Sequence, residues 1–119
     1  MKKFNLKDRI KSFGYAFRGI KLLLKEHNSW IHIISAVIVC FLGFYYKIKT
    51  TEWLAIIISI GIVLMAETFN TSIEELADKV NPEKDIKIKN TKDLAAGAVL
   101  ISAIMAIVIG SIIFVPKIF

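Results

Sequence analysis

The residues that could do chemistry form a polar stripe directly after an apolar run of the sequence. The stripe consists of Glu67, Asn70, Thr71, Glu74 and Asp78. Spacings of three, one, three and four residues place these side chains on one face of an α-helix. Residues 53–65, immediately before them, are apolar enough to enter a bilayer, where ionisable groups are costly and rarely lack a function. The stripe therefore indicates a site at the membrane boundary for a metal ion and a phosphorylated substrate.

Three apolar blocks separate the polar segments of this 119-residue chain. They cover residues 30–46, 53–69 and 94–115, and 55% of all residues are hydrophobic, with a mean hydropathy of +0.61. Each block is about as long as a helix that crosses a hydrocarbon core of roughly 30 Å. We therefore expect one all-α membrane domain over residues 1–119, with membrane-spanning helices at 29–46, 52–80 and 91–116.

Basic residues are distributed unevenly around these expected helices. Thirteen of the sixteen Lys and Arg residues lie either in residues 1–25 or in the segment 79–93. The positive-inside rule makes the side that carries them cytoplasmic. We expect a multi-pass protein of a bacterial plasma membrane with its N-terminus in the cytoplasm. A chain this apolar is not expected to bind nucleic acid, despite its net charge of +6.

The N-terminal segment, residues 5–25, has the pattern of an amphipathic surface helix. Apolar side chains recur there at helical spacing, and basic side chains occupy most of the other face. Several residues are candidates for the ends of the helices that follow. Asn28 or Ser29 could cap the first span, and Asn90 or Thr91 the third, while the segment 81–83 contains a proline that would end the second.

Two blocks of sequence together resemble a known family. The first is Glu67-x-x-Asn70-Thr71-x-Ile73-Glu74-x-x-x-Asp78, and the second is Lys92-Asp93-x-Ala95-Ala96-Gly97-Ala98-Val99. They are similar to the signature of the bacterial membrane-embedded diacylglycerol kinase and undecaprenol kinase family. The segments Gly14-Tyr15-Ala16-Phe17-Arg18-Gly19 and Glu26-x-Asn28-x-x-x-His32 also resemble it, the latter more closely in its undecaprenol kinase branch.

This resemblance implies a homotrimer that uses ATP and Mg²⁺ to phosphorylate the primary hydroxyl of a membrane lipid, either undecaprenol or diacylglycerol. It implies that Glu67 is the general base, and that Glu26 and Glu74 hold the metal bound to ATP. An alignment without a gap places His27 at the position of Glu26. Asn70 and Asp78 are implied as supporting residues of the site.

The resemblance also implies roles for residues outside the stripe. Tyr15, Lys92 and Asp93, together with Glu26 and Glu74, would contact ATP, and Arg18 would contact the lipid substrate together with Glu67. The loop at Glu83, Lys84 and Asp85 corresponds to a segment that meets the nucleotide. The chain has no glycine-rich phosphate loop, so side chains would have to build the site. Phosphoryl transfer requires a carboxylate base, a divalent cation and a further positive charge nearby.

Simpler structural explanations exist for several of these residues. Glu67 and Asn70 could be interhelical hydrogen-bond partners, and Lys92 with Asp93 could be an ordinary helix start. Glu75 points away from the stripe, where we expect it to be solvated or paired with Lys79. For His32 the sequence favours packing or hydrogen bonding over metal binding, because a second ligand at helical spacing is missing.

A different class of function also remains open, that of a small multidrug-type transporter or structural membrane subunit. A transporter of that kind would need about four spans and an acid near the middle of the membrane. The chain instead shows three spans, with its acids close to the basic segments. This arrangement favours the kinase.

Overall fold

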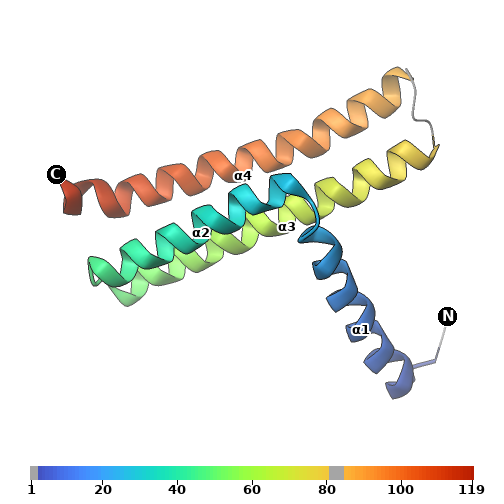
Figure 1. Cartoon of the computed structure of the whole chain (residues 1–119), viewed down its shortest axis with the longest axis horizontal. Helices are drawn as coiled ribbons and strands as arrows, with labels where there is room; N and C mark the ends of the chain where they lie inside the picture. The colour runs from blue at the N-terminus through green and yellow to red at the C-terminus, as the bar shows by residue number, and fades with distance from the viewer. Residues whose placement is uncertain (1–2, 81–84) are drawn as a thin grey trace.

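The computed structural model describes residues 3–80 and 85–119, and in these ranges the chain is helical apart from short connections. The four helices are α1 (Leu6–Leu23), α2 (His27–Tyr45), α3 (Thr50–Val80) and α4 (Ile86–Ile118). Figure 1 shows α2, α3 and α4 lying side by side while α1 projects away from them. The predicted helix end at Asn81, Pro82 and Glu83 and the predicted nucleotide loop at Glu83 and Lys84 lie outside the described residues.

Helices α2, α3 and α4 are each long and apolar enough to cross a membrane. Helices α3 and α4 contain 31 and 33 residues. At 1.5 Å per residue they are about 46 and 50 Å long, which exceeds a hydrocarbon core of about 30 Å. Both helices are therefore longer than the hydrocarbon core. Most of their large apolar side chains are exposed on the isolated chain, which is typical of residues that face lipid.

The best-packed region lies at the end of the bundle where α2 turns into α3. Ile48 and Ile56 form a buried cluster there with Ile113 and Phe114 of α4. At the same end, Lys117 Nζ of α4 lies 3.2 Å from Glu52 Oε2 of α3. These contacts hold the two long helices together at the end opposite the polar stripe.

The joint between α1 and α2 is made by the side chain of Ser29. Its hydroxyl donates to the Leu23 carbonyl at 2.6 Å and lies 2.7 Å from the Glu26 carbonyl. The predicted cap at Asn28 or Ser29 is wrong, because the N-cap is Glu26, which makes no side-chain capping bond. Ser29 instead lies inside α2, fully buried, where it ties the new helix to the end of the previous one.

Helix α4 begins five residues before the expected residue 91. The Asp85 side chain accepts hydrogen bonds from the backbone N–H groups of Lys87 and Ile88, at 2.8 and 3.4 Å. The predicted cap at Asn90 or Thr91 is therefore wrong. An aspartate caps a helix as well as an asparagine does, so the helix begins at the earlier of the two signals.

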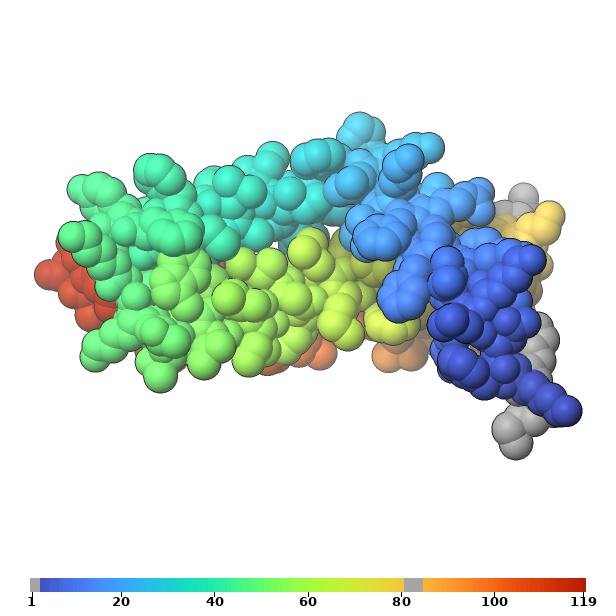
Figure 2. All heavy atoms as spheres, turned by 90° about the horizontal axis from the view of Figure 1, so that it is seen from below, coloured from blue at the N-terminus to red at the C-terminus, as the bar shows by residue number. Residues whose placement is uncertain are grey.

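Helix α1 packs little against the rest of the chain. Its apolar residues, including Phe13 and Phe17, are exposed, and only Leu23 at its end is buried. In Figure 2, which views the molecule from below, α1 stands in front of one end of the three-helix bundle because it projects toward the viewer. An amphipathic helix with an uncovered apolar face fits the lipid interface predicted for it.

Candidate active site

The polar stripe of α3 runs from the buried part of the bundle to its surface. Glu67 is 3% exposed and Asn70 is 7% exposed. Glu74 is half-buried and Asp78, at the end of the stripe, is exposed. The helical spacing predicted from the sequence is thus present, and the stripe connects the membrane-embedded part of α3 with its polar end.

The buried carboxylate of Glu67 meets a histidine of the neighbouring helix. His32 Nε2 of α2 lies 3.5 Å from Glu67 Oε2, and the two side chains are 18% and 5% exposed. The expectation that His32 is packed or hydrogen-bonded agrees with this contact. A carboxylate that is buried needs polar groups around it, and the imidazole of His32 places one beside Glu67.

Asn70 connects the deep and shallow parts of the stripe. Its Nδ2 donates to Glu74 Oε1 at 3.4 Å, so the two side chains are linked one helical turn apart. Its Oδ1 is buried and has no hydrogen-bond partner among the described residues. A buried acceptor without a partner is unfavourable, so Asn70 Oδ1 is suited to accept a hydrogen bond from a substrate or from a water bound with it.

Ion pairs occupy the polar end of the stripe. Lys92 Nζ of α4 lies 2.6 Å from Asp78 Oδ1 of α3, and Lys89 Nζ lies 2.8 Å from Asp93 Oδ2. The structure therefore brings Lys92 and Asp78 together across the two long helices. These exposed pairs are worth little to stability, so both cations can exchange a carboxylate for a phosphate at small cost.

Glu26 lies in a groove between the end of α1 and the face of α3. Thr71, Ser72 and Glu75 of α3 line the same groove, which also includes Leu23. The sequence predicted that Glu75 lies off the stripe, either solvated or paired with Lys79. Glu75 makes no ion pair with Lys79 among the described residues. Glu75 comes near Glu26 because the connection between α1 and α2 packs beside α3. The spacing of residues within α3 contains no information about this contact.

No group of three metal-ligating side chains assembles within the described part of the chain. Glu26 and Glu74 alone would be a poor resident metal site. Magnesium that arrives with ATP needs only one or two protein carboxylates, because phosphate oxygens and waters complete its shell. The donors present fit a metal carried by the nucleotide.

Tyr15 and Arg18 lie on α1, away from the stripe. Both are exposed, and neither forms a hydrogen bond or ion pair with the carboxylates of α3 in the described structure. Arg18 lines a shallow groove with Lys21 and Lys25, which makes that side of α1 strongly basic.

The comparisons with known proteins agree on one family. Residues 14–114 match the family described as Prokaryotic diacylglycerol kinase. The chain is 37% identical over 108 residues to an undecaprenol kinase of Bacillus subtilis, covering 90% of this chain and 88% of that protein. It is 29% identical over 107 residues to a diacylglycerol kinase of Synechocystis, covering 88% and 61%, and 26% identical over 110 residues to one of Escherichia coli, covering 83% and 82%.

Proposed function

This chain belongs to the prokaryotic diacylglycerol kinase family and is a lipid kinase, and we propose that it transfers the γ-phosphate of ATP to the primary hydroxyl of undecaprenol. The similar undecaprenol kinase and the Glu26-Asn28-His32 joint favour this lipid over diacylglycerol. The matched family argues against the transporter and structural-subunit alternatives. The main support for the site is that Glu67 is buried beside His32, where the apolar part of α3 passes into the polar stripe.

In the proposed reaction Glu67 acts as the general base. Its carboxylate takes the proton of the lipid hydroxyl, and the lipid oxygen forms a bond to the γ-phosphorus. The bond from that phosphorus to the oxygen bridging the β- and γ-phosphates breaks, and ADP leaves with the electron pair. His32, in contact with Glu67, would hold the carboxylate in position.

The shallow end of the stripe would receive the nucleotide. Glu74 and Glu26 would hold Mg²⁺, which offsets the negative charge of the phosphates when it is bound. Lys92 would exchange Asp78 for a phosphate oxygen, and Asp93 and Tyr15 would contact the rest of the nucleotide. Asn70 Oδ1, buried and without a described partner, would accept a hydrogen bond at the reacting group.

Arg18 is proposed to contact the lipid substrate from α1. Its side chain is exposed on a basic surface, and an amphipathic helix would hold it at the level of lipid headgroups. It would reach the lipid near the hydroxyl that Glu67 deprotonates. Such a contact would hold the acceptor at the interface.

We propose that the active unit is a homotrimer. A single chain leaves Tyr15 and Arg18 away from the carboxylates and assembles no three metal ligands among its described residues. Neighbouring copies could complete the site, and the small side chains at Ala95 to Ala98 would allow close helix contact.

We propose that the N-terminus and the loop between α3 and α4 lie in the cytoplasm of a bacterial cell. Both segments are basic, and the polar stripe ends beside that loop. ATP is available on this side. The nucleotide and the lipid hydroxyl would then meet at the inner surface of the plasma membrane.

Parallel phosphorylation assays test the proposed function. The purified protein, in lipid–detergent micelles with Mg²⁺, is given ATP labelled at the γ-phosphate and either undecaprenol or dioleoylglycerol. Faster labelling of undecaprenol supports the proposal, and faster labelling of diacylglycerol rejects the proposed acceptor. Labelling of neither lipid would contradict the kinase activity at the proposed site.

A further inference from the structure

The side chains of Ser29 and Trp30 hold the end of α1 against the start of α2. The Ser29 hydroxyl lies 2.6 Å from the Leu23 carbonyl oxygen, and Nε1 of Trp30 donates to the Leu24 carbonyl at 2.7 Å. Carbonyls at the C-terminal end of a helix have no partner within that helix. Here two of them accept hydrogen bonds from side chains of the next helix.

These bonds fix the direction of α1, because this helix packs little against the rest of the chain. Of the 18 described residues of α1, only Leu23 is buried, and α1 leaves the three-helix bundle at this joint (Figure 1). Ser29 is fully buried, so its hydroxyl cannot exchange its protein partners for water. The joint is therefore a fixed connection between the two helices.

Glu26, a proposed metal ligand, lies inside this joint. Its backbone N–H donates to the Leu23 carbonyl at 3.0 Å, and its own carbonyl oxygen lies 2.7 Å from Ser29 Oγ. Its side chain does not cap α2 and makes no hydrogen bond or ion pair among the described residues. The backbone of Glu26 is thus held from both sides, while its carboxylate is available in the groove beside α3.

We propose that Ser29 and Trp30 are positioning residues, which hold Glu26 where it can bind the metal that arrives with ATP. This inference rests on the proposed function and deepens it. The hydrogen bonds of both side chains go to backbone carbonyls, so the two residues act through Glu26. Groups that orient a metal ligand typically change metal affinity by about 10- to 100-fold.

The Mg²⁺ dependence of phosphate transfer tests this role. The purified kinase is assayed with ATP and undecaprenol over a range of Mg²⁺ concentrations. Ser29→Ala should raise the Mg²⁺ concentration for half-maximal rate roughly tenfold and leave kcat at saturating Mg²⁺ and ATP nearly unchanged. Glu26→Gln removes the carboxylate itself and should shift the Mg²⁺ dependence at least as far.

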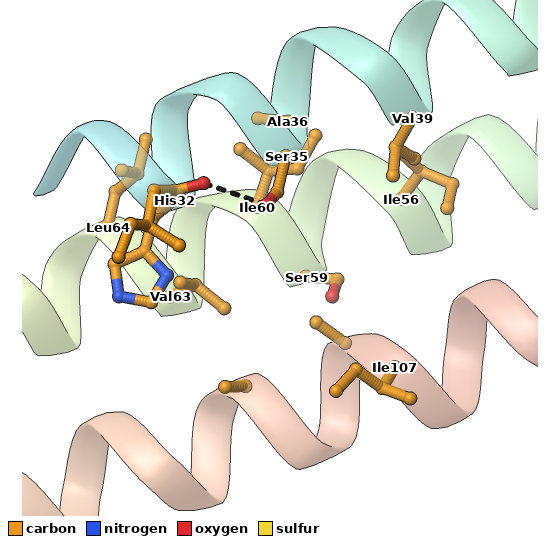
Figure 3. A pocket seen from close by; sticks show the side chains of 13 residues that line it. His32, Ser35, Ala36, Val39, Ile56, Ser59, Ile60, Val63, Leu64 and Ile107 are labelled. Atoms are coloured by element: carbon orange, nitrogen blue, oxygen red, sulfur yellow. Dashed lines mark hydrogen bonds between the residues drawn. The ribbon is translucent and has the colours of Figure 1, made fainter. Parts of the chain in front are cut away.

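Two further variants separate positioning from a general loss of stability. Trp30→Phe keeps an aromatic ring at an exposed position and removes the N–H donor, so it should raise the same Mg²⁺ concentration roughly threefold. Ser35→Ala is the matched control, because the Ser35 hydroxyl donates to the Ile31 carbonyl at 2.7 Å entirely within α2 (Figure 3). It should leave the Mg²⁺ dependence unchanged.

Three results of these assays would overturn the proposal. One is an unchanged Mg²⁺ dependence in Ser29→Ala, and another is a loss of kcat alone, which would show that the joint only stabilises the fold. The third is an equal shift in Ser35→Ala. If Ser29→Ala does not fold, Trp30→Phe decides by the same criteria.

A distance measurement tests the joint without turnover. Spin labels on cysteines at Lys11 of α1 and Lys79 of α3, in a Cys40→Ser background, are measured by pulsed electron resonance, with labelled subunits diluted among unlabelled ones. The unmodified protein should give one narrow distance distribution and Ser29→Ala a broader one, and equal widths would overturn the proposal. Failure of the unmodified protein to phosphorylate any lipid would instead reject the proposed function, whereas the distances report on the joint independently.

Discussion

At the scale of single residues, burial divides the polar stripe into two parts with different roles. Glu67 is almost completely buried and contacts His32, whereas Asp78 is exposed and paired with Lys92. A buried carboxylate is suited to a proton-transfer step that must exclude water. Exposed groups with weak ion pairs are suited to bind a charged ligand from solution.

Two isosteric substitutions separate these roles. Glu67→Gln removes the proposed base, so the rate of phosphate transfer should fall roughly 100-fold or more while ATP binding is kept. Glu74→Gln should instead weaken Mg²⁺-dependent ATP binding. Glu52→Gln makes the same chemical change at the far end of α3 and should alter neither. Phosphate transfer is measured at saturating lipid and ATP binding by calorimetry, and a Glu67→Gln enzyme with most of its turnover would refute the base assignment.

The contact of His32 with Glu67 predicts a positioning role for this histidine. His32→Leu removes the ring nitrogen that lies 3.5 Å from Glu67 Oε2. Losing a polar partner of a buried carboxylate costs about 1–3 kcal/mol, so kcat should fall roughly 5- to 150-fold. His32→Gln retains an N–H donor on a side chain of similar reach and should recover much of the loss. The KM for ATP should be unchanged in both. Equal kcat values for the two variants would show that His32 only fills space.

At the scale of elements, the turn from α2 to α3 shows how the chain closes the end of the bundle that lies opposite the polar stripe. The backbone N–H groups of Lys47 and Ile48 bond to the carbonyls of Phe44 and Gly43, at 3.3 and 3.1 Å. Lys47 has φ 51°, the left-handed conformation that ends a helix in this way. The chain thereby reverses, and Trp53 packs against the end of α2.

This close approach makes Gly43 sensitive to substitution. A Cβ at this position would lie 2.7 Å from Cη2 of Trp53, whose ring also packs on Phe44 with centroids 4.8 Å apart. Gly43→Ala should therefore destabilise the protein by about 1–3 kcal/mol. Gly110→Ala, with nothing within 4 Å, is the control. Thermal unfolding in one detergent compares them, and equal midpoints would contradict the packing argument.

At the scale of the whole molecule, the basic segments and the polar stripe lie at the same end of the bundle. Cysteines placed at Lys87 and at Thr50, in a Cys40→Ser background, test the orientation. A membrane-impermeant thiol reagent added to intact cells should label position 50 and not position 87. Labelling at position 87 alone would reverse the topology and separate the site from cytoplasmic ATP.

The proposed trimer also belongs to this scale, because one chain does not close the site. In detergent, light scattering combined with sedimentation should give a mass of three chains for the active species. Mixing Glu67→Gln subunits with unmodified ones should then lower activity if neighbouring copies share sites. A monodisperse monomer with full activity would refute the assembly.

The sequence alone determined the features that depend on local periodicity. Apolar block lengths specify the three candidate spans, because a helix must cover a fixed hydrocarbon thickness. Spacing along α3 specifies which polar residues share a face. The motifs indicated the family, which the comparisons then confirmed.

Only the tertiary structure decided the contacts between residues far apart in the sequence. His32 meets Glu67, Glu26 shares a groove with Glu75, and an apolar cavity opens between three helices. Helical periodicity describes one helix at a time and contains no information on the rotation of its neighbour. The start of α4 at Asp85 was also decided by the folded chain, since two capping signals compete there and only their hydrogen bonds show which is used.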